Sequence, residues 1–202
     1  MKRLYAVLMA FCVVSCAAFA QENWSENVRV EADLGSGILT TRFEVRGAYS
    51  FPLAKGFHWD AGLNVSTNSS SLLSAIMDGY GAGINYSSVC ILPFASIWYK
   101  DVYLSDGFGL GTTEAGVAFV PVDIRFGWQP HFFEKDKGFC FKIELGLLGA
   151  PSVNTYHEVI YEDDGVTPKT DDNGHEVTKT VKTVSKTVSI DPSITIGVTY
   201  KF

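Results

Sequence analysis

The last sixteen residues of the chain alternate strictly between two kinds of side chain. Apolar residues occupy every second position from Val188 to Phe202, and polar or small residues occupy the positions between them. Successive side chains of a β-strand point to opposite faces, whereas an amphipathic helix repeats its apolar residues every three or four positions. The pattern therefore predicts one long strand with an apolar face and a polar face.

Seven further segments repeat this period of two. Four are strongly marked, at residues 42–51, 57–65, 120–128 and 139–147, and three are weaker, at residues 28–34, 82–98 and 102–110. In the segment 120–128, we expect Val120 on the same face as Ile124. In the segment 82–98, the two faces are mixed between Val89 and Leu92, which predicts a β-bulge there. The chain is therefore predicted to be all-β, with eight strands.

The connections between these strands differ in length. Short ones are expected at residues 52–56, near Lys100 and Asp101, and at 129–138, whereas long ones span 67–81 and about 150–186. We therefore expect short turns at one end of the fold and long loops at the other. An even number of antiparallel strands arranged in this way is typical of an eight-stranded up-and-down transmembrane β-barrel. A soluble barrel such as a lipocalin shows the same alternation but places its apolar face inside.

The positions of the aromatic residues favour the transmembrane barrel. Aromatic side chains gather at the short-turn ends of the predicted strands: Trp24, Tyr49, Phe51, Phe57, Trp59, Trp98, Tyr99, Tyr103, Phe126, Trp128, Phe139, Phe141, Tyr200 and Phe202. A ring of aromatic residues at one height is expected at a lipid interface, where amphipathic rings are favoured. A soluble core has little reason to sort its aromatic residues by height.

The composition agrees with a two-faced barrel and excludes two other classes of protein. The mean hydropathy is +0.12, 47% of the residues are hydrophobic and 19% are charged. This apolar content excludes a disordered chain. The net charge of -6 argues against a nucleic-acid partner, because such a protein needs basic residues to neutralise phosphates.

The first twenty residues read as a secretory signal peptide. Lys2 and Arg3 precede an uncharged apolar stretch at residues 4–20, which ends in the small-residue pattern Ala18-Phe19-Ala20. We expect residues 1–20 to be removed and residues 21–202 to form a barrel in the bacterial cell outer membrane. Cleavage before Cys16, in a lipobox-like context, is the alternative and would leave a lipidated cysteine. The remaining cysteines, Cys90 and Cys140, could form one disulfide, but the sequence does not indicate that they do.

The C-terminus resembles the assembly signal of outer-membrane proteins. Residues 195–202 place Gly197 before two alternating aromatic residues, Tyr200 and a terminal Phe202. The resemblance implies that these three residues are read by the barrel-assembly machinery. By length and strand count, the chain without its leader resembles the small eight-stranded barrels of the OmpA, OmpX and OmpW type.

Charged residues fall on the polar face of the predicted strands and should point into the barrel. An eight-stranded barrel is only wide enough for side chains to fill it, and a charge left unpaired in such a space is costly. We therefore predict a plugged lumen with an internal network of ion pairs; the alternative is a narrow channel for small or hydrophobic solutes. The predicted network comprises Arg29, Glu31, Arg42, Glu44, Arg46, Asp60, Asp123, Arg125, Lys142 and Glu144, with Asp33 and Asp191 on the same face.

The sequence predicts no catalytic, cofactor-binding or metal-binding residue. His58 and Asp60 share one strand face, but at the short-turn end, where outer-leaflet lipid would be out of reach, so a structural pair is expected. The loop residues His131, His157 and His175 lack metal-ligand spacing. No phosphate-binding, dinucleotide or zinc motif is present. A lipid-modifying outer-membrane enzyme is a distant alternative.

The last long loop predicts a surface feature. Its β-prone segments 156–161 and 177–184 flank an acidic, turn-rich tip at residues 162–174. We expect a hairpin standing above the membrane. Its exposed edge could capture an extracellular protein by strand addition; the alternative is a solvated loop without a specific partner.

Overall fold

A computed structural model describes residues 27–72, 76, 84–130, 138–163, 165, 167–185 and 188–202. The predicted leader, the lipobox-like cysteine Cys16, Trp24 and His131 lie outside these residues. Within the described part of the chain, no helix is both long enough and apolar enough to cross a membrane.

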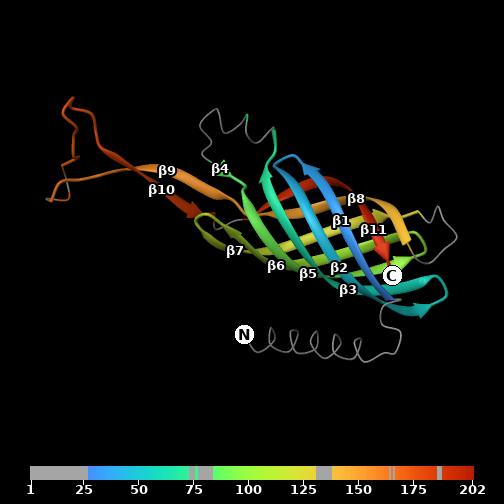
Figure 1. The fold of residues 1–202 in the computed structure, drawn as a ribbon. Helices are drawn as coiled ribbons and strands as arrows, with labels where there is room; N and C mark the ends of the chain where they lie inside the picture. Colours follow the sequence, from blue (N-terminus) through green and yellow to red (C-terminus); the bar gives the residue numbers. More distant parts are fainter. Residues whose placement is uncertain are drawn as a thin grey trace, which may run out of the picture.

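Eight antiparallel strands form a closed barrel, which confirms the predicted fold class (Figure 1). Around the barrel the order is β1-β11-β8-β7-β6-β5-β3-β2, and pairing of β1 with β11 closes it. The strands are β1 (Val28–Gly37), β2 (Thr40–Ala54), β3 (Phe57–Ser70), β5 (Ser88–Tyr99), β6 (Val102–Thr113), β7 (Gly116–Trp128), β8 (Gly138–Ala150) and β11 (Ser189–Lys201).

Three more strands form a small separate sheet in the order β10-β9-β4. They are β4 (Ile84–Asn85), β9 (Val153–Val159) and β10 (Thr178–Val184). The strands β9 and β10 pair along their whole length and project beyond the barrel, as Figure 1 shows. We call the barrel end that carries this hairpin the hairpin end, and the opposite end, where β1 begins and β11 finishes, the terminal end.

The predicted separation of short turns from long loops is wrong. Two-residue turns occur at the terminal end, at 55–56 and 100–101, but also at the hairpin end, at 38–39 and 114–115. Near these turns, β1 and β6 contain glycines, among them Gly35 and Gly111. A glycine has no side chain, so the alternation of apolar and polar residues cannot be followed there. Only the connections 71–87 and 151–188 are long at the hairpin end.

The barrel exposes its apolar face and buries its polar face. Leu34, Phe43 and Ile196 are typical of the outer face, with relative exposures of 59%, 48% and 58%. The charged residues of the same strands are buried inside, as exemplified by Glu44 and Arg125 at 0% and 1%. This arrangement is the reverse of a soluble barrel, in which charge faces the solvent and the interior is apolar.

The ladder is irregular at two places, near the end of β2 at residues 52–54 and within β7, but not in β5. In β7 the pairing advances from Gly107 with Asp123 to Gly109 with Val120, so one residue of β6 lies opposite two of β7, which form a β-bulge. Pro121, which cannot donate a ladder hydrogen bond, lies within the bulge. The bulge reverses the faces of β7, so Val120 points inward and is fully buried, contrary to the prediction.

The strand β5 alternates regularly, so the bulge predicted within residues 82–98 is wrong. Its pairing with β3 shows no register shift between Tyr99 and Ser88. Its faces look mixed in the sequence because apolar residues, including Leu92 and Phe94, line the interior.

Two of the aromatic residues expected at a lipid interface point into the barrel instead. Trp98 and Tyr103 are each only 2% exposed and stack on one another at 4.1 Å between ring centroids. The others within the described residues lie on the outer face near the terminal end; Tyr200, for example, contacts Phe139 at 4.8 Å and Phe202 at 4.9 Å. The sequence could not distinguish the two inward rings, because β5 and β6 carry aromatic residues on both faces.

Candidate functional site

The strands place all of the predicted network residues on the inner wall of the barrel. Each strand alternates, so its polar residues at every second position face the lumen. The ten residues are between 0% and 4% exposed, and Asp33 and Asp191 are equally buried: Arg29, Glu31, Arg42, Glu44, Arg46, Asp60, Asp123, Arg125, Lys142 and Glu144. Ion pairs join nine of the ten, all but Arg42, and Asp33 into one set, which we call the lumen network.

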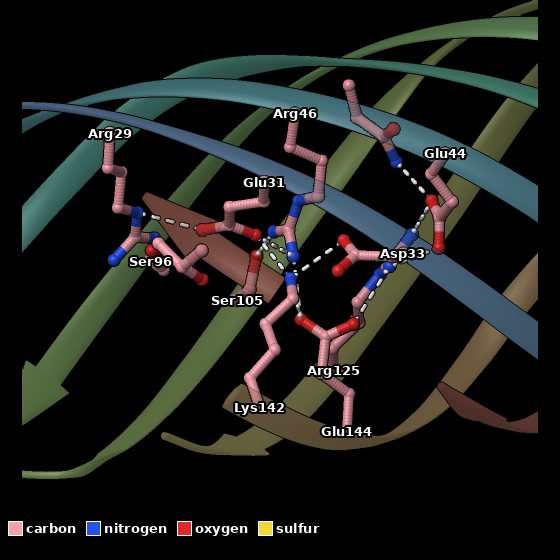
Figure 2. A network of polar contacts seen from close by, with 12 residues as sticks. Arg29, Glu31, Asp33, Glu44, Arg46, Ser96, Ser105, Arg125, Lys142 and Glu144 are labelled. Atoms are coloured by element: carbon pink, nitrogen blue, oxygen red, sulfur yellow. Dashed lines mark hydrogen bonds and ion pairs between the residues drawn. The ribbon is translucent and has the colours of Figure 1, made fainter. Parts of the chain in front are cut away.

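Glu144, on β8, contacts three cations, as Glu31 on β1 does (Figure 2). Its oxygens lie 2.6 Å from Arg46 Nη1, 3.1 Å from Arg125 Nη1 and 3.2 Å from Lys142 Nζ. The hydroxyl of Tyr103 also donates a hydrogen bond to Glu144 Oε1. A buried carboxylate needs such compensation, because removal from water otherwise disfavours its charge.

Arg125, on β7, binds two carboxylates in the forked geometry that a guanidinium allows. Its Nη1 and Nη2 each lie 2.7 Å from an oxygen of Glu44. Its Nε and Nη2 lie 2.5 Å and 2.7 Å from the oxygens of Asp123. Glu44 also accepts a hydrogen bond of 2.7 Å from Asn64 Nδ2. In the strand order, β7 and β2 are four places apart in a ring of eight, so the pair between Arg125 and Glu44 crosses the lumen.

Lys142, on β8, lies among three carboxylates in Figure 2. Its Nζ contacts Glu31 and lies 2.8 Å from Asp33 Oδ2, in addition to Glu144. Gly197 on β11 makes room for this group, because a Cβ there would lie 1.7 Å from Asp33 Oδ1. Gly197, which the sequence assigned only to the assembly signal, is therefore also required by the lumen network.

Arg29 forms the part of the lumen network nearest the terminal end. It lies 2.8 Å from Glu31 and 2.6 Å from Asp60, and its guanidinium is 4.4 Å from the centre of the Trp98 ring. The ring of His58 stacks on the ring of Trp98, with 5.1 Å between their centroids, and His58 Nε2 is 3.9 Å from Asp60 Oδ1. Arg29 therefore holds the carboxylate of Asp60 in a structural ion pair.

Asp191 and Arg42 stand apart from the lumen network. Asp191 accepts hydrogen bonds of 2.9 Å from the backbone N–H groups of Leu39 and Thr40, and one of 2.7 Å from Thr40 Oγ1. It therefore fastens the 38–39 turn to β11. No carboxylate of the described residues lies within ion-pair distance of Arg42.

Two kinds of ligand chemistry can be assessed from the same geometry. Oxygens of Asp33, Glu44 and Glu144 lie within 4.8 Å of one another, close enough to bind a cation together. Lys142 and Arg125 already occupy that position as counter-ions, so the group does not offer a free ligand set. Cys90 and Cys140 are free thiols on β5 and β8, which are not neighbours in the barrel, so the possible disulfide between them is not formed.

The projecting hairpin presents exposed charges. Lys182 Nζ lies 2.8 Å from Glu114 in the 114–115 turn and ties β10 to the barrel, and Lys179 lies 3.1 Å from Glu158 across the hairpin. At the tip, Asp171 accepts hydrogen bonds from the backbone N–H groups of residues 173 and 175, at 2.9 and 2.8 Å. The bond from residue 175 is the main cause that lowers the pKa of Asp171 below its usual value.

Comparison with known proteins gives a structural likeness but no match of sequence. No protein-family model matches the chain, and no curated protein matches its sequence. Among solved structures, the chain is similar to the β domain of the Bordetella autotransporter BrkA, with 11% sequence identity and a TM-score of 0.33. The match covers 87% of this chain and 98% of that chain. These comparisons assign no function to the protein.

Proposed function

We propose that the chain is an integral outer-membrane protein whose lumen is closed and whose projecting hairpin faces the cell exterior. The observation that carries the proposal is the inverted barrel: the outer face is apolar and the interior is charged. On the outward face of the described barrel strands, Asp106 is the one side chain of the Asp, Glu, Lys, Arg and His types. An apolar band flanked by aromatic residues matches the hydrocarbon core and one interface of a bilayer.

Separation of bacterial membranes by density tests the location. After expression of the full-length gene product, the protein is expected in the outer-membrane fraction, and its unboiled form should migrate differently from its boiled form on a denaturing gel. Recovery in the soluble periplasmic fraction would contradict the proposal. Recovery in the inner membrane would contradict it equally.

We further propose a structural or surface-interaction role rather than transport. The pair between Arg125 and Glu44 crosses the lumen, and Arg46 on β2 contacts Glu144 on β8. Side chains held together across the barrel leave no continuous path for water at that level. The lumen network therefore supports a plug over a narrow channel.

Conductance in planar bilayers separates the plug from the channel. The native protein should be electrically silent, whereas a variant combining Glu44→Ala with Arg125→Ala should pass ions, because it loses the pair that crosses the lumen. Heat-modifiable migration of the variant provides the control for folding. Steady single-channel steps from the native protein would refute the plug and favour the channel.

The hairpin supports the interaction role. Within the described residues, β10 pairs with β9 along one edge only, and its side chains are mostly exposed. An open strand edge is a template for an extended segment of another protein. Deletion of residues 162–173 shortens the tip, and the matched change Lys179→Gln alters a hairpin charge without shortening it. Adhesion of vesicles carrying the protein to cultured cells should fall with the deletion; unchanged adhesion would refute this role.

A further inference from the structure

Arg42 is a buried cation that has no carboxylate within ion-pair distance among the described residues. Its side chain is 2% exposed, and none of its three guanidinium nitrogens has a hydrogen-bond partner in the described part of the chain. The other arginines of the lumen each pair with at least two carboxylates. A guanidinium carries five donors and stays protonated, so its burial without an anion is costly.

The carboxylates of Glu44 and Asp191 are committed to other groups. Glu44, two residues along β2, receives Arg125 and Asn64. Asp191 receives the backbone of the 38–39 turn. Neither can move to Arg42 without leaving another buried group unpaired.

Two polar side chains of β3 lie near Arg42 and have unused hydrogen-bonding capacity. Its cross-strand neighbour on the inner face is Asn68, whose Nδ2 donates to Ser88 Oγ at 3.0 Å and to Cys90 Sγ at 3.2 Å, while its Oδ1, an acceptor, has no partner in the described residues. The hydroxyl of Ser66, on the same face of β3, is buried and also has no partner in the described residues. The guanidinium and this hydroxyl can donate to an oxyanion.

A pocket at the hairpin end adjoins this position through Asn68, the cross-strand neighbour of Arg42. An open pocket of about 360 Å³ lies between the ends of β3, β5 and β6, and Asn68 and Ser88 form part of its lining. Its other lining residues are Thr67, Ser87, Val89, Thr112, Thr113 and Glu114. Glu114 is the one acidic residue among them, and Lys182 neutralises it at 2.8 Å.

We propose that Arg42, with Ser66, binds a phosphate group that enters the barrel from the hairpin end. The phosphate comes either from a free solute or from a lipid headgroup, since both present the same oxyanion to the guanidinium. The site lies on the hairpin side of the pair between Arg125 and Glu44, so it does not require an open lumen.

Phosphate-dependent stability tests the site in the full-length protein, folded in a detergent without phosphate. Inorganic phosphate replaces chloride at constant ionic strength, and urea unfolding is followed. At a phosphate concentration 100 times Kd, linkage predicts an unfolding constant lowered about 100-fold. The Arg42→Gln variant should lose this saturable effect. It should keep only the non-saturable stabilisation that phosphate gives to any folded protein by being excluded from its surface.

Two further variants keep the proposal falsifiable. Asn68→Asp places a carboxylate beside Arg42, so this variant should also lose the phosphate response while remaining folded. Lys179→Gln removes an exposed lysine of the hairpin that pairs with Glu158, and it should respond as the native protein does. Equal responses of the native protein and Arg42→Gln would overturn the proposal, as would loss of the response in Lys179→Gln alone.

The same assay, run separately with two phosphate compounds, distinguishes the two sources of the phosphate. Saturation by a short-chain phosphatidic acid at a lower concentration than by inorganic phosphate supports the site with a lipid headgroup as its ligand. Saturation by inorganic phosphate at the lower concentration supports the site with a free solute. A response to neither compound beyond that of Arg42→Gln overturns it.

Discussion

Removal of the Lys142 charge should destabilise the barrel strongly. The ammonium group is buried and lies among Glu31, Asp33 and Glu144. In Lys142→Met the three carboxylates keep their mutual repulsion and lose their shared cation. Breaking a buried ion pair by removing one partner costs about 3 to 5 kcal/mol, so we expect a loss of this size in the free energy of unfolding.

Urea unfolding of the protein in lipid vesicles, followed by tryptophan fluorescence, measures the loss. Lys179→Met is the matched control, because Lys179 also pairs with a carboxylate but is 58% exposed, and such pairs contribute at most about 1 kcal/mol. Adding Asp33→Asn to Lys142→Met removes one of the stranded charges, and the two changes should couple by about 0.5 to 3 kcal/mol. Equal losses in Lys142→Met and Lys179→Met would refute the reasoning, since they would mean that water screens the lumen charges.

Three further predictions concern separate parts of the molecule. Gly197→Ala should destabilise the barrel by about 1 to 3 kcal/mol, because the added Cβ displaces Asp33. The loss should also appear when the protein refolds without assembly machinery. Gly47→Ala is the control and should change the urea midpoint little, because a Cβ at Gly47 meets nothing within 4 Å. Asp106→Leu should raise the free energy of unfolding in vesicles by up to about 2 kcal/mol, because it removes a charge from the lipid-facing surface, and a lower value would contradict that orientation. The lowered pKa of Asp171 means that its turn is stabilised above the usual aspartate pKa and loses this contribution as the pH falls through the lowered value. The protection factors of the turn amides, in which the intrinsic pH dependence of exchange is divided out, should therefore fall only in acid, and Asp171→Asn should abolish that dependence; a fall near neutral pH would contradict it.

The fold class could be predicted because it depends on a local property, the alternation of side chains. Each strand that alternates between charged and apolar residues also shows which residues face the lumen. The prediction failed where alternation itself fails. In β7, the bulge at Pro121 exchanges the inner and outer faces. In β5, apolar residues such as Leu92 face the interior, so the two faces look alike in the sequence.

The pairing inside the barrel could not be predicted from the same pattern. Which charges meet depends on the stagger between strands distant in sequence, as for Arg125 and Glu44, which are 81 residues apart. The sequence also gives no sign that Gly197 leaves space for Asp33. Nor does it show that, within the described part of the chain, Arg42 is the one lumen arginine with no carboxylate at ion-pair distance. Each of these features arises from contacts across the closed barrel, not from spacing along one strand.

Quenching of single-tryptophan variants by lipids brominated on their acyl chains tests the central claim most directly. Trp128 lies on the outer face and is 45% exposed, whereas Trp98 lies inside at 2%. In vesicles, a variant that keeps only Trp128 should be quenched strongly by the brominated lipid, and one that keeps only Trp98 should not. Quenching of Trp128 by aqueous iodide but not by lipid, in a protein that stays in solution without detergent, would contradict the assignment of the outer face to the membrane.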